Sequence, residues 1–293
     1  MTEPPRRIDH LVHAVDDLDG AADLYRRLGF QVGARNRHPW GTENRLVQFG
    51  SSFIELITVG DGAEIAPHAP GSFSFGAFVR DYLRERQGLA MLVLDSADAR
   101  ADAARFAAAG IGDFDPFFFE REGRRPDGSA TRVAFTLAFA ADPGLPAAGF
   151  FVCQQHFPES FWNPAFQRHP NGATDIRAVT IAAGDPPAHA GFLAAFTGSP
   201  ARRAVDGLNA PLRGGGHIDV ERTGDAEGIV AFATGVPDLA AQAEILAGAG
   251  ILFEASGDRV TVHAAEALGA GIAFRAGAGG TRRDMPPPAP CTA

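Results

Sequence analysis

A carboxylate in an apolar segment is the first sign of chemistry in the sequence. Glu55 lies in FIELI at residues 53–57, where its neighbours leave no continuous polar face. Burying a carboxylate costs free energy unless it is paired or bound to a metal. Glu55 could still point to solvent, but the missing polar face favours a cavity, where it would act as a catalytic group.

A polar loop precedes this segment. HPWGTENRL, at residues 38–46, places side chains that donate and accept hydrogen bonds around a glycine that permits close backbone approach. Such a loop suits a small polar group of a ligand, such as a carboxylate or a carbonyl oxygen, although an ordinary turn also uses Gly and Asn. If the loop lines a pocket, we expect His38 as a catalytic group and Trp40, Thr42 and Asn44 as substrate-binding residues.

Two histidines and two arginines are further candidates. His10, in IDHLVHAV, is either a metal ligand or a buried histidine that is hydrogen-bonded inside a sheet. His13 should face the opposite side of the same strand, because successive side chains alternate. Arg121 and Arg132 could clamp an anionic substrate, but in a chain with 26 positive charges we expect both at the surface.

The segments that carry these residues belong to a repeated pattern. Residues 8–29 read as a strand, then a helix capped by Asp17 and ended by Gly29, and short strand candidates follow. The same order of strand, helix and three strands begins again near residues 89, 176 and 228. Four copies account for nearly the whole chain.

The repeats predict the domain organisation. One such unit cannot bury both faces of its sheet, so the units must pair, and a chain of 293 residues also suggests two domains. We predict an α+β fold in which four βαβββ modules form two tandem domains. The boundaries are 6–158 for the first domain, 159–175 for a connector, 176–278 for the second domain and 279–293 for a flexible tail.

The pattern resembles the vicinal oxygen chelate superfamily, which includes glyoxalase I, extradiol dioxygenases, fosfomycin-resistance enzymes and bleomycin-binding proteins. The similarity rests on IDHLVHAVDDLDGAADLYRRLGF at 8–30, HPWGTENRL at 38–46 and FIEL at 53–56. It implies two tandem glyoxalase/bleomycin-resistance/dioxygenase-like domains, in each of which two modules close around a cavity.

The resemblance also implies a divalent metal, Zn, Ni, Mn or Fe, held by the first and last strands of each module. These positions fall on His10 and Glu55 in the first module and on Leu89 and about Gln154 in the second. Leucine cannot bind a metal, so we expect His10, Glu55 and His156 as ligands and Gln154 as a weak ligand or substrate-binding residue. The second domain lacks the ligands of an extradiol dioxygenase, which makes that activity less favoured.

Composition excludes several classes of protein. All 26 positive charges are arginines, so no lysine can form a Schiff base or serve a P-loop. A net charge of −9 argues against nucleic-acid binding. Because no apolar run reaches the length of a membrane span, we expect a cytoplasmic protein that binds a small molecule and binds no membrane. A homodimer is compatible with the sequence.

Three functions remain open from the sequence. The first is a metal-assisted lyase or isomerase that acts on a small oxygenated metabolite. The second is a metal-free protein that binds or sequesters a small molecule, of the bleomycin-resistance type. The third is acid–base catalysis without a metal by His38 or Glu55.

Overall fold

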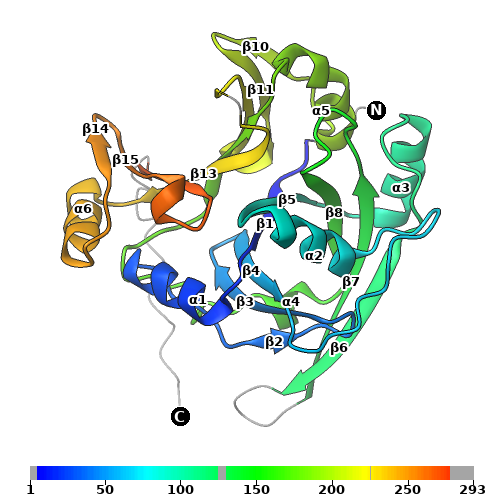
Figure 1. Cartoon of the computed structure of the whole chain (residues 1–293), viewed down its shortest axis with the longest axis horizontal. Helices are drawn as coiled ribbons and strands as arrows, with labels where there is room; N and C mark the ends of the chain where they lie inside the picture. The colour runs from blue at the N-terminus through cyan, green and yellow to red at the C-terminus, as the bar shows by residue number, and fades with distance from the viewer. Residues whose placement is uncertain (1–4, 125–129, 225, 278–293) are drawn as a thin grey trace, which may run out of the picture.

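Two eight-stranded sheets form the framework of the computed structural model, which describes residues 5–124, 130–224 and 226–277 (Figure 1). The first sheet has the strand order β2-β3-β4-β1-β5-β8-β7-β6, and the second has β10-β11-β12-β9-β13-β16-β15-β14. The two orders are the same when strands are counted within each sheet. This arrangement confirms the predicted α+β fold with two tandem domains, while the tail expected at 279–293 lies outside the described residues.

Each sheet is assembled from two equivalent halves. In the first sheet, the two central strands pair in antiparallel fashion, and each pairs on its other side with a parallel strand. The second sheet repeats this scheme. The strands of the first sheet are β1 (Ile8–Ala14), β2 (Asn36–Arg37), β3 (Thr42–Gln48), β4 (Phe53–Val59), β5 (Gly88–Asp95), β6 (Phe117–Arg124), β7 (Ala130–Ala140) and β8 (Gly149–Gln155).

The second sheet is built from shorter strands on average, and helices connect the strands of both. Its strands are β9 (Ile176–Ala182), β10 (Arg202–Ala204), β11 (Gly207–Pro211), β12 (His217–Glu221), β13 (Gly228–Val236), β14 (Glu254–Ser256), β15 (Arg259–Val262) and β16 (Gly271–Ala276). The helices are α1 (Leu18–Arg27), α2 (Phe75–Glu85), α3 (Ala99–Ala108), α4 (Pro158–Phe161), α5 (Ala190–Thr197) and α6 (Leu239–Gly248), with short 3-10 turns η1 (Pro186–His189), η2 (Arg213–Gly215) and η3 (Ala264–Glu266).

An aspartate begins the helix of three of the four modules. The side chains of Asp17, Asp98 and Asp238 each accept hydrogen bonds from two backbone N–H groups in the first turn. A capping carboxylate satisfies donors that the helix leaves free and interacts favourably with its dipole. The third module differs, because a 3-10 turn that begins with Pro186 leads into α5.

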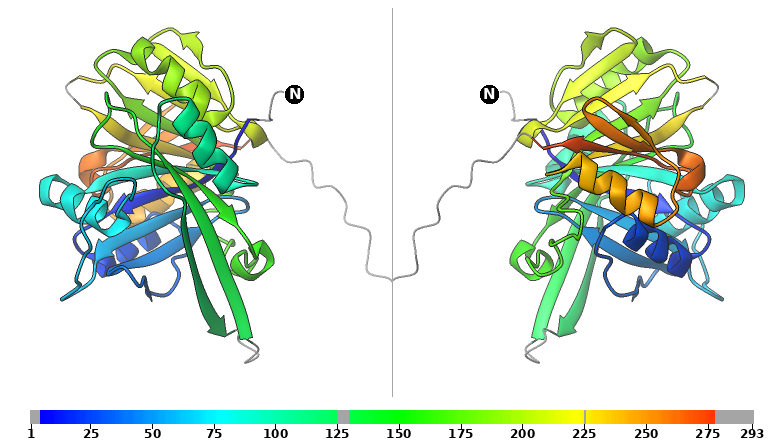
Figure 2. Two further views of the ribbon diagram at one scale, coloured as in Figure 1. Left: turned by 90° about the vertical axis from the view of Figure 1, so that its right-hand side faces the viewer. Right: turned by 90° about the vertical axis from the view of Figure 1, so that its left-hand side faces the viewer.

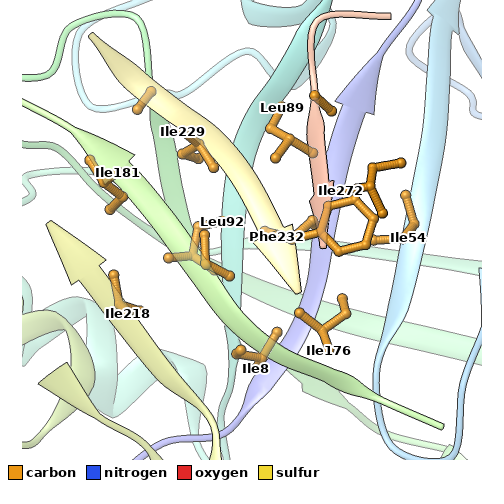
Figure 3. Close-up of a cluster of buried hydrophobic side chains, with 14 of the residues drawn as sticks. Ile8, Ile54, Leu89, Leu92, Ile176, Ile181, Ile218, Ile229, Phe232 and Ile272 are labelled. Carbon is orange, nitrogen blue, oxygen red and sulfur yellow. The ribbon is translucent and has the colours of Figure 1, made fainter. Parts of the chain in front are cut away.

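A continuous apolar core joins the two domains. Figure 3 shows Ile8, Leu89 and Leu92 from the first sheet facing Ile181 and Phe232 from the second, all of them buried. Side chains from α1, α3, α5 and α6 complete this inter-sheet core. The two sheets thus pack against each other through one shared core, and the other face of each sheet points away from this core (Figure 2).

Among the described residues, a second apolar cluster lies on that other face in the first domain. Phe75 and Val79 of α2 pack there with Val93 of β5 and Phe151 of β8. The helix is supplied by the long link between β4 and β5, whereas the equivalent link between β12 and β13 is short. No helix within residues 5–124, 130–224 and 226–277 is long and apolar enough to span a membrane.

Candidate active site

A cavity of about 60 Å³ lies between the first sheet and α2. Strands β1, β3, β4, β6, β7 and β8 each contribute side chains to it, and the connector closes one side through Phe161. Most of its wall is aromatic, and the polar groups are few. The lining comprises His10, His38, Trp40, Asn44, Leu46, Phe53, Glu55, Phe75, Phe119, Arg121, Phe135, Leu137, Phe151, Cys153 and Phe161.

Glu55 lies at the centre of the polar wall and is only 6% exposed. Its Oε1 atom accepts a hydrogen bond from the Asn44 amide and lies 3.7 Å from His38 Nε2. Its Oε2 atom lies 3.9 Å from His10 Nε2. The structure therefore brings together Glu55, His38, Asn44 and His10, which the sequence had singled out separately.

His10 is held between two carboxylates. Its Nδ1 atom lies 2.6 Å from Asp9 Oδ1, and Asp9 also accepts a hydrogen bond of 2.8 Å from Gln155 Nε2. The imidazole stacks on Phe53 with ring centroids 4.2 Å apart. Because an ionised carboxylate only accepts, the contact with Asp9 directs the proton to Nδ1 and leaves Nε2 toward Glu55.

His38 is fixed by a chain of hydrogen bonds rather than by a ligand. Its Nδ1 atom lies 2.8 Å from Thr42 Oγ1, its Nε2 atom lies 3.3 Å from Asn44 Nδ2, and its ring stacks on Trp40. Burial lowers the pKa of His38, and Arg121 lowers it further, whereas Glu55 opposes the shift. His38 therefore favours the neutral form, and Thr42, fully buried behind it, supports the imidazole instead of reaching the cavity.

Arg121 brings a positive charge to the cavity wall, which corrects the expectation that it is a surface residue. It projects from β6 on the same face as Phe119 and lines the cavity. Burial lowers the pKa of its guanidinium, and Glu55 opposes that shift. Within the described part of the chain, no hydrogen bond or ion pair satisfies it. A guanidinium in this state is suited to an oxyanion or carboxylate of a ligand.

Two residues expected at the site lie elsewhere. Gln154 holds the start of α3: its Oε1 accepts from Ala99 N at 3.1 Å and its Nε2 donates to Ala97 O at 3.0 Å. His156 is exposed, and its Nε2 lies 2.8 Å from Thr136 Oγ1. Side chains alternate along β8, so Cys153 faces the cavity while these two point to the other side.

A shift in strand register explains a second correction. Leu89 was expected at the position equivalent to His10, but it lies in the inter-sheet core (Figure 3). The pairing of β1 with β5 shifts between Val12 and His13, which lets Met91 face the cavity side instead. Counted back from the helix caps, Met91 is the equivalent of His10.

The last strands of the first two modules, β4 and β8, can be aligned in the same way. Val12 pairs with Glu55 across β1 and β4, and Val93 pairs with Phe151 across β5 and β8. Phe151 is therefore the equivalent of Glu55. Two of the four positions that the resemblance assigns to metal ligands are thus apolar residues, Met91 and Phe151.

The donor set does not fit a divalent ion. Catalytic metal sites ordinarily take about three protein ligands, and the described residues include no group of three or more His, Cys, Asp or Glu side chains placed to hold one. Asn44 donates to both Glu55 and His38, so its amide occupies the space between them. His10 and Glu55 remain as a pair, and His156 cannot complete it.

The remaining candidates fall outside the cavity. His13 is fully buried on the opposite face of β1, where Nδ1 lies 2.8 Å from the Tyr25 hydroxyl and Nε2 lies 2.9 Å from the Leu268 carbonyl oxygen. Arg132 is exposed and paired with Glu120. The alternation of side chains therefore predicts the direction of His13, and the surface position expected for Arg132 agrees with the structure.

Sequence reasoning missed Asp9 and the helix that covers the cavity. Asp9 is 1% exposed and binds His10, and a carboxylate inside the apolar run IDHLV was the available signal. The helical spacing of apolar residues in 75–83 was the signal for α2.

The fold and the cavity between paired modules define the chain as a protein of the vicinal oxygen chelate class. The family model described as "Glyoxalase-like domain" matches residues 8–197, and the chain belongs to this family. This match confirms the resemblance seen in the sequence. A search of curated proteins by sequence finds no match.

Solved structures share the fold at low sequence identity. A hypothetical protein from Staphylococcus aureus is 14% identical with a TM-score of 0.67, and the match covers 92% of this chain and 99% of that one. A mutant of 4-hydroxymandelate synthase from Streptomyces coelicolor is 15% identical with a TM-score of 0.60, covering 95% of both chains. A fusion of a xylose isomerase-like TIM barrel with 4-hydroxyphenylpyruvate dioxygenase is 15% identical with a TM-score of 0.53, covering 95% of this chain and 51% of that one.

Proposed function

We propose that the first-domain cavity catalyses proton transfer on a small carbonyl or hydroxy acid, as a lyase or isomerase does, with the chain's own side chains as acid and base. The observation that carries the proposal is the placement of His10 between Asp9 at 2.6 Å and Glu55 at 3.9 Å, at the wall of a largely aromatic cavity. An imidazole that is oriented by a carboxylate and presents its other nitrogen to a ligand is a general base.

His10 Nε2 would take a proton from the carbon next to a substrate carbonyl. The imidazolium that forms is stabilised by the carboxylates on both of its sides, Asp9 and Glu55. The electron pair left on carbon moves to the carbonyl oxygen. In an α-hydroxy carbonyl compound the carbon that loses the proton bears the hydroxyl group. Transfer of the hydroxyl proton to the neighbouring oxygen and return of the proton from His10 to the former carbonyl carbon give the isomer, so atoms and charge balance without another reactant.

Arg121 would bind the oxygen that becomes negative or a carboxylate beside it. Its guanidinium lines the same cavity and lacks a partner among the described residues. A positive charge attracts an oxyanion more strongly in an aromatic cavity than in water. Asn44 and the neutral His38 keep Glu55 in position for this arrangement.

The divalent metal expected from the resemblance is not part of this proposal. Its ligands would have been His10, Glu55 and His156, and the last of these lies outside the cavity. A metal-free binding or sequestering protein is the second candidate. The aromatic rings that stack in the cavity wall favour it, because they would hold a ligand without any proton transfer.

Exchange of carbon-bound protons with deuterated solvent tests the proposal. Pyruvate, glycolaldehyde and dihydroxyacetone are the probes, followed by NMR, with wild type, His10→Asn and the second-domain control His217→Asn. We expect exchange in wild type and in the control, and a loss of roughly 100-fold or more in His10→Asn. Exchange no faster than in buffer for all three probes contradicts the enzyme, and probe binding without exchange supports the binding protein.

A further inference from the structure

A second and larger space adjoins the cavity. It measures about 470 Å³ and is formed by β3, β6, β7, the connector and the loop before β2; we call it the outer groove. Leu46, Arg121 and Phe161 line both the cavity and the outer groove. The two spaces therefore share a wall, and Arg121 stands in it.

The sizes of the two spaces differ in a way that matters for the ligand. About 60 Å³ holds a reacting group of only a few atoms, whereas the outer groove falls in the range of about 300–1,000 Å³ that is typical of pockets for whole small molecules. We propose that the substrate is an acid with an uncharged, amphipathic tail: its reacting head enters the cavity, and its tail lies in the outer groove. This inference rests on the proposed function for the identity of the head.

The chemistry of the outer groove fits such a tail. Its lining mixes apolar groups such as Val133 and Phe166 with neutral polar ones such as Ser160 and Thr131. Arg121 and Glu122, of opposite sign, are its only charged residues in the part of the chain that the structure describes. The Thr131 hydroxyl is buried and has no hydrogen-bond partner among the residues that the structure describes, so it is available to a hydroxyl or amide of the tail.

The connector fixes the boundary between the two spaces. The Gln48 side chain donates to the Phe161 carbonyl oxygen at 3.0 Å and accepts from Asn163 N at 2.8 Å. The Phe161 ring packs against Phe53 at 5.1 Å and against Phe135 at 5.7 Å. Phe161 is thus held in place from both sides and limits how much of a ligand passes from the outer groove to the cavity.

Binding of a series of acids with increasing length tests the inference. The probes are ω-hydroxyalkanoates of two to eight carbons, beginning with glycolate, measured by calorimetry. We expect the affinity to rise about threefold for each added methylene until the groove is filled. Alkanediols of the same lengths, which lack the carboxylate, should bind at least about tenfold more weakly, because they do not pair with Arg121.

Two variants locate the tail. Ala34 is exposed at the rim of the outer groove, and Ala34→Trp should reduce the affinity of the long acids to that of glycolate while glycolate itself stays within twofold. Ala107→Trp, on the exposed face of α3, is the matched control and should change neither. Thr131→Val should weaken the hydroxy-tailed acid about fivefold relative to the methyl-tailed acid of equal length.

The outcomes separate this inference from the proposed function. Equal affinity across the series, or a loss in Ala34→Trp that is the same for glycolate and for the long acids, overturns the role of the outer groove. Glycolate binding that survives Arg121→Met and His10→Asn overturns the site of the head, whatever the series shows.

Discussion

The two domains have the same strand order, yet within residues 5–124, 130–224 and 226–277 it is the free sheet face of the first that a helix covers above a cavity. In the first domain, the link between β4 and β5 supplies α2, which covers that face; in the second, the link between β12 and β13 is too short to do so. Equivalent positions then differ in burial. Glu55 pairs with Val12 and its side chain is 7% exposed, whereas Asp219 pairs with Thr180 at the matching place and its side chain is 22% exposed.

Asp219 and Glu55 also differ in their electrostatic environment. Asp219 lies 3.2 Å from His217 Nε2 and accepts a 2.7 Å hydrogen bond from Asn209. Burial opposes the shift, but these hydrogen bonds lower the pKa of Asp219. It is a solvated, satisfied carboxylate, and Ala178 stands where the first domain has His10. A covering helix, more than an acid on the strand, therefore turns this face of the sheet into the wall of a cavity.

The largest expected effect is therefore confined to the first domain. Glu55→Gln keeps the shape but removes the negative charge beside His10, and it should reduce proton exchange by roughly 100- to 10,000-fold. Asp219→Asn, the equivalent change in the second domain, should leave exchange unaltered. Rates are measured by NMR on both variants after their unfolding curves have been compared. Equal losses in the two variants would contradict the assignment of the site to one domain.

Truncation of a side chain in the inter-sheet core should lower the free energy of unfolding more than truncation of one in the cavity wall. Phe232 is fully buried between the sheets, while Phe119 lines the cavity and is partly exposed. Phe232→Ala should lower the free energy of unfolding by about 3–5 kcal/mol, and Phe119→Ala by about 2 kcal/mol or less, because it enlarges a space that already exists. Urea unfolding measures both. The reverse order would mean that the cavity is packed as tightly as the core.

Most of the fold could be predicted from local sequence patterns. Asp17 and Asp98 cap their helices, as residues of this type commonly do. Side chains alternate between the two faces of a strand, so His10 and His13 of β1 lie on opposite faces. The position of Glu55 followed from the cost of burying a carboxylate. These features depend on a few neighbouring residues, so the sequence is sufficient to predict them.

The second module was harder to place, because its geometry depends on register. The shift in pairing between Val12 and His13 moves Leu89 to the core and turns Met91 to the cavity side. One residue of register exchanges the two faces of a strand, and the sequence has no turn or glycine at Ala90 to mark the shift. Register is also the reason why the sequence predicted the equivalent of Glu55 at about Gln154, although the pairing of β5 with β8 places it at Phe151.

Two buried histidines should make the protein sensitive to acid. Burial lowers the pKa of both His13 and His169 to about 4, despite their hydrogen bonds to the Leu268 and Gln48 carbonyl oxygens. The unfolded chain, with a histidine pKa near 6.5, binds the proton first, so stability is full above about pH 6.5 and falls as the pH drops toward 4.

His13 also links the first domain to the second through the Leu268 carbonyl oxygen. A shift from 6.5 to about 4 corresponds to about 3 kcal/mol. Urea unfolding between pH 7 and pH 4 measures this fall, and His13→Gln should make the curve flatter. A curve for His13→Gln that is as steep as that of wild type would assign the acid sensitivity to other groups.

The smallest expected effect concerns metal ions and compares the domains once more. His10 and Glu55 offer two donors, and Ala178 and Asp219 offer one at the equivalent positions. Two donors bind a divalent ion weakly, and a ligand stabilises a fold only as its concentration exceeds its dissociation constant. We therefore expect the unfolding temperature to change by less than about 2 °C when Zn, Ni, Mn or Fe ions, or EDTA, are added. Such a change corresponds to less than roughly 1 kcal/mol in the free energy of unfolding. A larger rise that disappears in His10→Asn but persists in Asp219→Asn would place an ion in the first cavity, and proton transfer would then have to be reconsidered with that ion beside Glu55.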